Sequence, residues 1–191
     1  MNTGEAQMSS RKIRVALVIM LALSLVATSI AVAAGRDHGK KGKGQFVAHL
    51  IGYNEVPSVN SPAHGDLTLA VGDGKLTWSL TYADFVNQPT VAHVHVGQPG
   101  VSGGVSFFFC GGAKPACPSS ASGPVTITGT VLPADILGPI PQAFAAGDLN
   151  SIVKAIQAGF TYANMHTSAF PLGEIRGQLE AAHGHGHGDN D

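Results

Sequence analysis

The chain has no marked excess of charge, because 11 Lys and Arg face 12 Asp and Glu for a net charge of −1. This balance argues against a nucleic-acid-binding protein, which needs a basic face. Common catalytic signatures are also missing: there is no Gly-rich phosphate loop leading into a helix, no Ser-His-Asp arrangement and no diagnostic pair of acids. Beyond residue 34, no stretch is long and apolar enough to span a bilayer.

Residues 1–34 have the three-part pattern of a secretory signal peptide. Three basic residues between positions 11 and 14 precede an apolar run that continues to about Val32, and small residues follow at 31–35. This order predicts cleavage and export to the periplasm, the cell surface or the medium. An uncleaved N-terminal membrane anchor is the alternative, since the run approaches the ~18 residues that span a bilayer.

The sequence has only two cysteines, Cys110 and Cys117, and their spacing matches no common zinc or redox motif. Export to an oxidising compartment favours a disulfide between them. The chain-entropy model gives roughly 2–3 kcal/mol of stabilisation for so short a loop. A metal-binding or reactive pair is the alternative to a structural disulfide.

Both ends of the exported part lack apolar periodicity. Residues 35–44 form a Gly- and Lys-rich stretch that predicts a flexible basic linker, and residues 182–191 predict a disordered tail. The tail carries His183, His185 and His187 between glycines, which is either a weak, flexible metal site or a solvated end without a task. The predicted folded unit therefore covers residues 45–181.

Short alternating segments between frequent turn signals dominate the folded unit. They predict a mostly β domain, an antiparallel sandwich or barrel of the immunoglobulin-like or superoxide-dismutase-like kind. Gly72-Asp73-Gly74 predicts a hairpin. Apolar residues at helical spacing predict a short helical crossover at 141–158, capped by Asp148 or Asn150. The predicted strands cover 46–51, 67–71, 75–82, 91–96, 105–109, 125–131, 160–165 and 174–179.

Three histidines are the strongest candidates for chemistry. His93 and His95 are two residues apart in a predicted strand, so their side chains share a face. His166 shares a face of another predicted strand with Asn164. If the two faces meet, three imidazoles converge on a site for copper or zinc. Water, Glu174 or Glu55 are the candidates for its fourth position.

Three separated motifs resemble one family, the CHRD domain, named after chordin. They read YNEVP at 53–57, AHVHVG at 92–97, and YANMHT at 162–167 followed by FPLGEIRGQL at 170–179. The match spans essentially the whole predicted folded unit. Two departures are Ser58, where the family usually has a second proline, and an extra valine, Val96, before Gly97.

The resemblance implies an extracellular, β-rich domain without an established enzymatic activity. In animals such domains occur in an antagonist of secreted growth factors. In bacteria they often stand alone behind a signal peptide, which is the type that this chain resembles. A His-x-His strand in an exported β domain is also similar to copper–zinc superoxide dismutase, at the level of architecture alone.

Each candidate residue also has a purely structural interpretation. The three histidines can form a hydrogen-bonded polar patch, with Asn164 tying down the following turn. Glu174 and Arg176, two residues apart, predict an ion pair more than a substrate site. His49 and His64 have the pattern of ordinary strand and loop residues.

The sequence thus predicts an exported CHRD-type binding module of undefined role, centred on a copper or zinc site. The alternatives are a metal-dependent redox or hydrolytic enzyme and a metal-free interaction domain of the cell envelope. The expected partner is an extracellular protein or a metal ion. No catalytic residue is assigned, and a non-enzymatic role is favoured over an enzymatic one.

Overall fold

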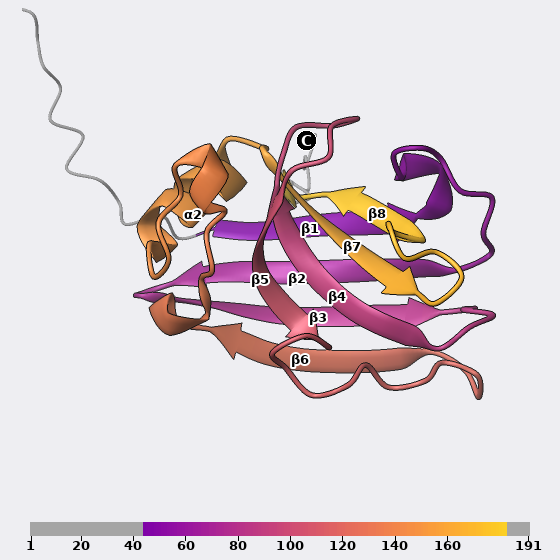
Figure 1. Cartoon of the computed structure of the whole chain (residues 1–191). Coiled ribbons are helices and arrows are strands. Elements are labelled where there is room, and N and C mark those ends of the chain that lie inside the picture. The colour runs from indigo at the N-terminus through magenta and orange to yellow at the C-terminus, as the bar shows by residue number, and fades with distance from the viewer. Residues whose placement is uncertain (1–43, 183–191) are drawn as a thin grey trace, which may run out of the picture. The chain divides into compact units, whose positions relative to one another are not determined.

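The computed structural model describes residues 44–182, in which β-strands dominate (Figure 1). Residues outside this range include the predicted signal peptide at 1–34, nearly all of the predicted linker and the three tail histidines. The strands are β1 (Gly44–Ile51), β2 (His64–Gly72), β3 (Lys75–Ala83), β4 (Pro89–Val96), β5 (Gly104–Cys110), β6 (Val125–Val131), β7 (Thr161–Thr167), β8 (Ile175–Gln178) and β9 (Glu180–Ala181).

All strands belong to one antiparallel sheet with the order β5-β4-β7-β8-β1-β2-β3-β6, and β9 pairs with β1. The sheet curls back on itself, so that β4 and β5 cross in front of β2 and β3 (Figure 1). The predicted mostly β, antiparallel, barrel-like fold is confirmed. Its two layers are halves of one curled sheet, in which β4 and β7 are hydrogen-bonded neighbours.

The core fills the space between these two layers. Leu67 and Leu80 from the rear strands and Val94, Phe107 and Met165 from the front strands are almost completely buried. Burying one such side chain contributes on the order of 1.5–3 kcal/mol. Because side chains alternate along a strand, the intervening residues of β4 and β7 face outward, away from this core.

The hairpin between β2 and β3 has the predicted turn. Gly72 pairs with Lys75, and Gly74 adopts a φ of 73°, a conformation that residues with a Cβ rarely adopt. The long apolar run 105–109 is typical of a strand that is buried on both faces. In the structure, however, Phe108 of β5 is only half buried, because it lies on the outer face of the sheet.

A short helix, α2 (Leu149–Gln157), forms within the predicted crossover at 141–158. Asp148 caps it by accepting a hydrogen bond from the Ser151 amide at 3.0 Å, as predicted. Ile152 and Ile156 are buried against the core. Three 3-10 turns complete the described elements: η1 (Gly52–Asn54), η2 (Pro133–Asp135) and η3 (Ile140–Gln142).

The predicted disulfide between Cys110 and Cys117 is present. It closes the loop after β5, in which the Gly111 amide donates to the Pro115 carbonyl at 2.7 Å. Gly111 is required there, because a Cβ would lie 2.2 Å from the Thr90 carbonyl oxygen. Within residues 44–182, no helix has the length and apolar character needed to cross a membrane.

Candidate metal centre

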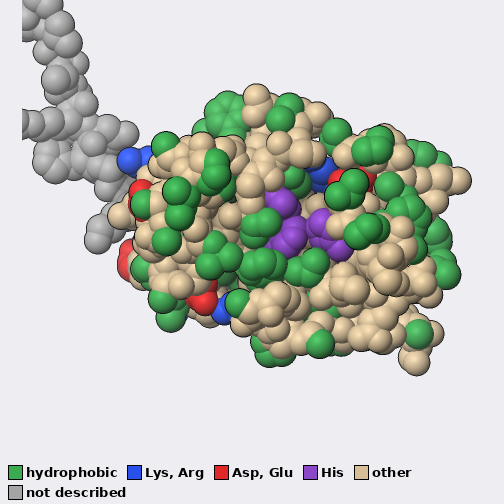
Figure 2. Space-filling view, in the orientation of Figure 1, with side chains coloured by type: hydrophobic (Ala, Val, Ile, Leu, Met, Phe, Trp, Pro, Cys, Tyr) green, Lys and Arg blue, Asp and Glu red, His purple; other side chains and the backbone are tan. Residues whose placement is uncertain are grey.

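The curled sheet brings the three candidate histidines together on its outer face. In the register of β4 with β7, His93 lies opposite Asn164, and His166 lies opposite Val91 one step further along. One ring nitrogen from each of His93, His95 and His166 lies within 4.8 Å of the other two. Figure 2 shows purple histidine side chains gathered on one face of the molecule.

This spacing is close to what a metal ion needs. Nitrogens that bind zinc at ~2.0–2.1 Å are on the order of 3.4 Å apart in tetrahedral geometry. The centre of the His93 ring lies 4.4 Å from the centre of the His95 ring and 4.7 Å from that of the His166 ring. The ring nitrogens are at most 4.8 Å apart, so they need to come closer by up to about 1.4 Å to share an ion.

Two of the rings have their orientation set by backbone carbonyls. His95 Nδ1 lies 2.8 Å from the Gly103 oxygen, and His166 Nδ1 lies 3.0 Å from the Pro171 oxygen. A carbonyl only accepts, so each Nδ1 must carry the proton and donate it. Each Nε2 is then left with a free lone pair, as in metal-bound histidines whose second nitrogen is held by the protein.

Four buried polar atoms of this cluster have no hydrogen-bond partner. They are His93 Nδ1, His95 Nε2, His166 Nε2 and Asn164 Oδ1, from a total of nine such side-chain atoms in residues 44–182. An unpaired buried polar group costs about 1–3 kcal/mol. A shared metal ion would satisfy the three nitrogens, and the donor set fits copper or zinc.

Burial also keeps the imidazoles neutral. Loss of hydration, together with the neighbouring His95 and His166 rings, lowers the pKa of His93 to about 3, and loss of hydration lowers that of His95 to about 4. Burial lowers the pKa of His166 as well. Metal ligands must be deprotonated, and at neutral pH these three rings already are.

Aromatic side chains support the cluster on both sides. Phe108 packs edge-on against His93 with ring centroids 5.3 Å apart. The Tyr162 ring stacks on His95 at 4.7 Å and 3°, and the Arg176 guanidinium lies 3.4 Å from the centre of the Tyr162 ring. A cation over a tyrosine face is attractive, so Arg176 helps to hold Tyr162 against His95.

Arg176 also holds the loop that orients His95. It is almost fully buried and donates through Nη2 to the carbonyls of Gln98 and Val101 at 3.1 and 2.9 Å. The Gly103 amide at the end of this loop donates to the Tyr162 hydroxyl at 3.1 Å. The loop is therefore fixed at both ends, with the Gly103 carbonyl in reach of His95.

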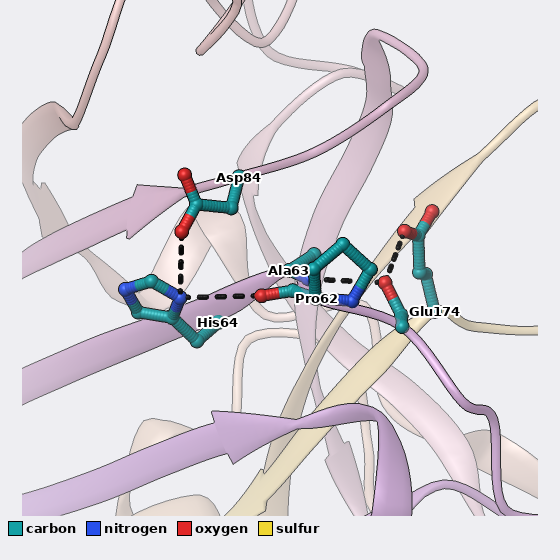
Figure 3. A network of polar contacts seen from close by, with 6 residues as sticks. Pro62, Ala63, His64, Asp84 and Glu174 are labelled. Atoms are coloured by element: carbon teal, nitrogen blue, oxygen red, sulfur yellow. Dashed lines mark hydrogen bonds and ion pairs between the residues drawn. The ribbon is translucent and has the colours of Figure 1, made fainter.

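The predicted ion pair between Glu174 and Arg176 is wrong, since none joins them within residues 44–182. Glu174 precedes β8 and accepts from the Ser61 hydroxyl at 2.7 Å and the Thr167 hydroxyl at 2.6 Å. Glu174 lies before the strand and Arg176 within it, so the two side chains do not lie side by side as they would on one continuous strand. Figure 3 shows the contact of Glu174 with the segment before β2, and the Thr167 hydrogen bond links this carboxylate to the end of β7.

Glu55 lies behind Asn164. The Asn164 Nδ2 donates to Glu55 Oε1 at 3.4 Å, and the Val56 amide donates to Oε2 at 3.3 Å. Burial raises the pKa of the Glu55 carboxyl. Neither Glu55 nor Glu174 belongs to the group of ring nitrogens within 4.8 Å, so the fourth ligand expected from either one is not part of that group.

The other candidate histidines lie elsewhere. His49 and Asp66 are exposed and 2.9 Å apart, and His64 lies 3.6 Å from exposed Asp84 (Figure 3). His183, His185 and His187 lie outside the described residues.

Some groups that support the histidine cluster were not predicted from the sequence. Tyr162 has a signal, because it alternates with Asn164 and His166. Phe108 and the carbonyls of Gly103 and Pro171 have none, because their approach depends on loop paths and on strand order.

Comparison with known proteins gives one result. No curated protein and no solved structure is similar enough to match the chain. A family model, described as the CHRD domain, matches residues 46–179. This match includes β4, β7 and β8, and with them every residue of the histidine cluster and its supports. It covers more than half of the sequence, and the chain belongs to the CHRD domain family.

Proposed function

We propose that this protein is an exported binding module that holds one copper or zinc ion between His93, His95 and His166. Two observations carry the proposal: one ring nitrogen of each histidine lies within 4.8 Å of the other two, and each ring has a buried nitrogen without a hydrogen-bond partner. A polar patch without a metal would leave these nitrogens unsatisfied, which is unfavourable in a buried site.

The ligand set supports copper and zinc over the common hard cations. Calcium and magnesium are bound by oxygen atoms, whereas neutral imidazole suits copper and zinc. The lowered pKa values of His93 and His95 keep both rings in the ligating form at neutral pH. At a generic site of this kind copper binds more tightly than zinc.

Export is part of the proposal. It is supported by the signal-like pattern of residues 1–34, by the extracellular setting of CHRD domains and by the Cys110–Cys117 disulfide. Retention by an uncleaved N-terminal segment is the alternative, and the mass of the mature chain distinguishes the two outcomes.

Metal analysis of the purified full chain tests the site. His183, His185 and His187 are first replaced by Ala, so that the tail cannot contribute ligands. After loading with copper or zinc and removal of loosely bound ions, we expect one ion per chain. His93→Ala should lower the bound metal at least tenfold, and the matched control His64→Ala should leave it unchanged. Equal metal content in all three proteins would contradict the proposal.

An enzymatic role is the second candidate, and one observation favours it. The cluster offers three protein nitrogens and reaches the molecular surface, as catalytic metal sites with an open position do (Figure 2). Such a site could support redox or hydrolytic chemistry. Metal-loaded protein that shows turnover lost in His166→Ala would establish this candidate, and absence of turnover would leave the binding module.

A further inference from the structure

Asn164 is placed to recognise whatever fills the remaining coordination position of the metal. It lies directly opposite His93 in the β4–β7 register and is only 3 % exposed. Its Oδ1 is the fourth buried atom of the cluster without a partner.

Glu55 fixes which end of the amide faces the histidines. The Asn164 Nδ2 donates to Glu55 Oε1 at 3.4 Å, so the other end of the amide group, Oδ1, points away from this carboxyl. Glu55 itself has little freedom, because a Cβ on Gly173 would lie 2.3 Å from the same Oε1. The Asn164 oxygen is thereby left for the side of the imidazole rings.

Direct binding of this oxygen to the metal is the less suitable arrangement. Amide oxygens suit hard cations such as calcium, whereas the three imidazoles select copper or zinc. Zinc sites with three protein ligands commonly keep a water molecule in the fourth position. A buried hydrogen-bond acceptor beside such a position favours a metal ligand that can donate a hydrogen bond.

We propose that Asn164 Oδ1 accepts a hydrogen bond from a water molecule or hydroxide ion bound at the open position of the metal. This inference rests on the proposed metal site and specifies its ligand class. The position takes small ligands that carry a proton, namely water, hydroxide and hydroperoxide. Anions without a proton, such as azide, place a negative atom against the Asn164 oxygen and bind less well.

Copper(II)-loaded full chain with the tail histidines replaced by Ala is the sample for the test. Water-proton relaxation detects an exchangeable water on the copper, and we expect one that azide displaces. Azide affinity is then measured from its charge-transfer absorption. Asn164→Leu, which keeps the size of the side chain and removes the acceptor, should bind azide about tenfold more tightly. Asn150→Leu, on the exposed surface of α2, is the matched control and should equal the parent chain.

The outcomes separate this inference from the proposed function. Copper uptake that does not depend on the three histidines would overturn the metal site itself. Copper that needs all three histidines but shows no exchangeable water would overturn the role of Asn164 alone, and this result does not depend on any Asn164 variant folding. Equal azide affinity in Asn164→Leu and the parent chain would also overturn the role of Asn164.

Discussion

At the scale of single residues, the cluster combines two opposing effects of burial. Loss of hydration keeps His93 and His95 neutral, which prepares them to bind a metal. The same burial leaves one nitrogen of each ring without a partner, which destabilises the metal-free fold. A residue arrangement that is unfavourable by itself and favourable with a ligand is expected at a binding site.

Acid should destabilise the metal-free protein through these rings. An unfolded histidine has a pKa of about 6.5, whereas folded His93 has one of about 3, so below pH ~6.5 the unfolded chain binds more protons. The free energy of unfolding should therefore fall by on the order of 1.4 kcal/mol per pH unit for each such ring as the pH drops from ~6.5 toward ~4.

Urea unfolding at several pH values, with a chelator present, measures this slope. His93→Ala should reduce it by the contribution of one ring, and His64→Ala, at an exposed position, should not. A parent chain whose stability is unchanged between pH ~6.5 and ~4.5 would refute the assigned burial of these rings.

Gly173 should be the most sensitive glycine near the site. Its φ of 129° is unfavourable for any residue with a Cβ, and a Cβ would also lie 2.3 Å from Glu55 Oε1. Gly123 has a similar φ of 125° with nothing within 4 Å of the added atom, so it is a matched control for backbone strain alone.

We expect Gly173→Ala to destabilise the protein by about 1–3 kcal/mol more than Gly123→Ala, because it displaces the buried carboxylate. Thermal unfolding of both variants gives the comparison. Equal destabilisation would show that Glu55 is not packed against Gly173.

At the scale of elements, the β4–β7 pair builds the site. Alternation along each strand predicts that His93 and His95 share one face and that Asn164 and His166 share another. This much follows from the sequence. That β4 and β7 are neighbours does not, because residues 97–160 separate them and strand order depends on how the whole sheet curls. The resemblance to CHRD domains indicates the family, and it does not indicate which strands pair with each other.

Successive side chains of β5 point to opposite faces of the sheet, so one phenylalanine contributes to the core and the next to the histidine cluster. Phe107 is fully buried in the core, whereas Phe108 lies on the outer face against His93. Phe107→Ala should lower the free energy of unfolding by about 3–5 kcal/mol, as for a large core side chain. Phe108→Ala should have a smaller effect on unfolding and a larger one on metal affinity. Chemical denaturation and metal titration of both variants test this, and a reversed order would contradict the assigned faces.

At the scale of the whole molecule, loops from distant parts of the chain complete the site. The loop after β4 supplies the Gly103 carbonyl, the turn before β8 supplies the Pro171 carbonyl, and the segment after β1 supplies Glu55. Each is a contact between segments far apart in sequence or an irregular turn, so no local pattern predicts it. The hairpin, the helix cap and the disulfide are short-range features, and the sequence predicted each of them.

The disulfide should stabilise the molecule without shaping the site. Reduction, or replacement of Cys110 and Cys117 by Ser, should lower the free energy of unfolding by roughly 2–3 kcal/mol, because the unfolded chain regains the freedom of a short loop. Metal stoichiometry should stay the same. Denaturation with and without reductant gives the first quantity, and loss of metal binding on reduction would place the two cysteines in the site.

Anomalous X-ray diffraction from crystals grown with copper or zinc tests the central claim most directly. The account predicts one strong peak per chain at ~2.0–2.1 Å from a ring nitrogen of each of His93, His95 and His166. No peak at this position, in crystals whose metal content is confirmed by fluorescence, would contradict it.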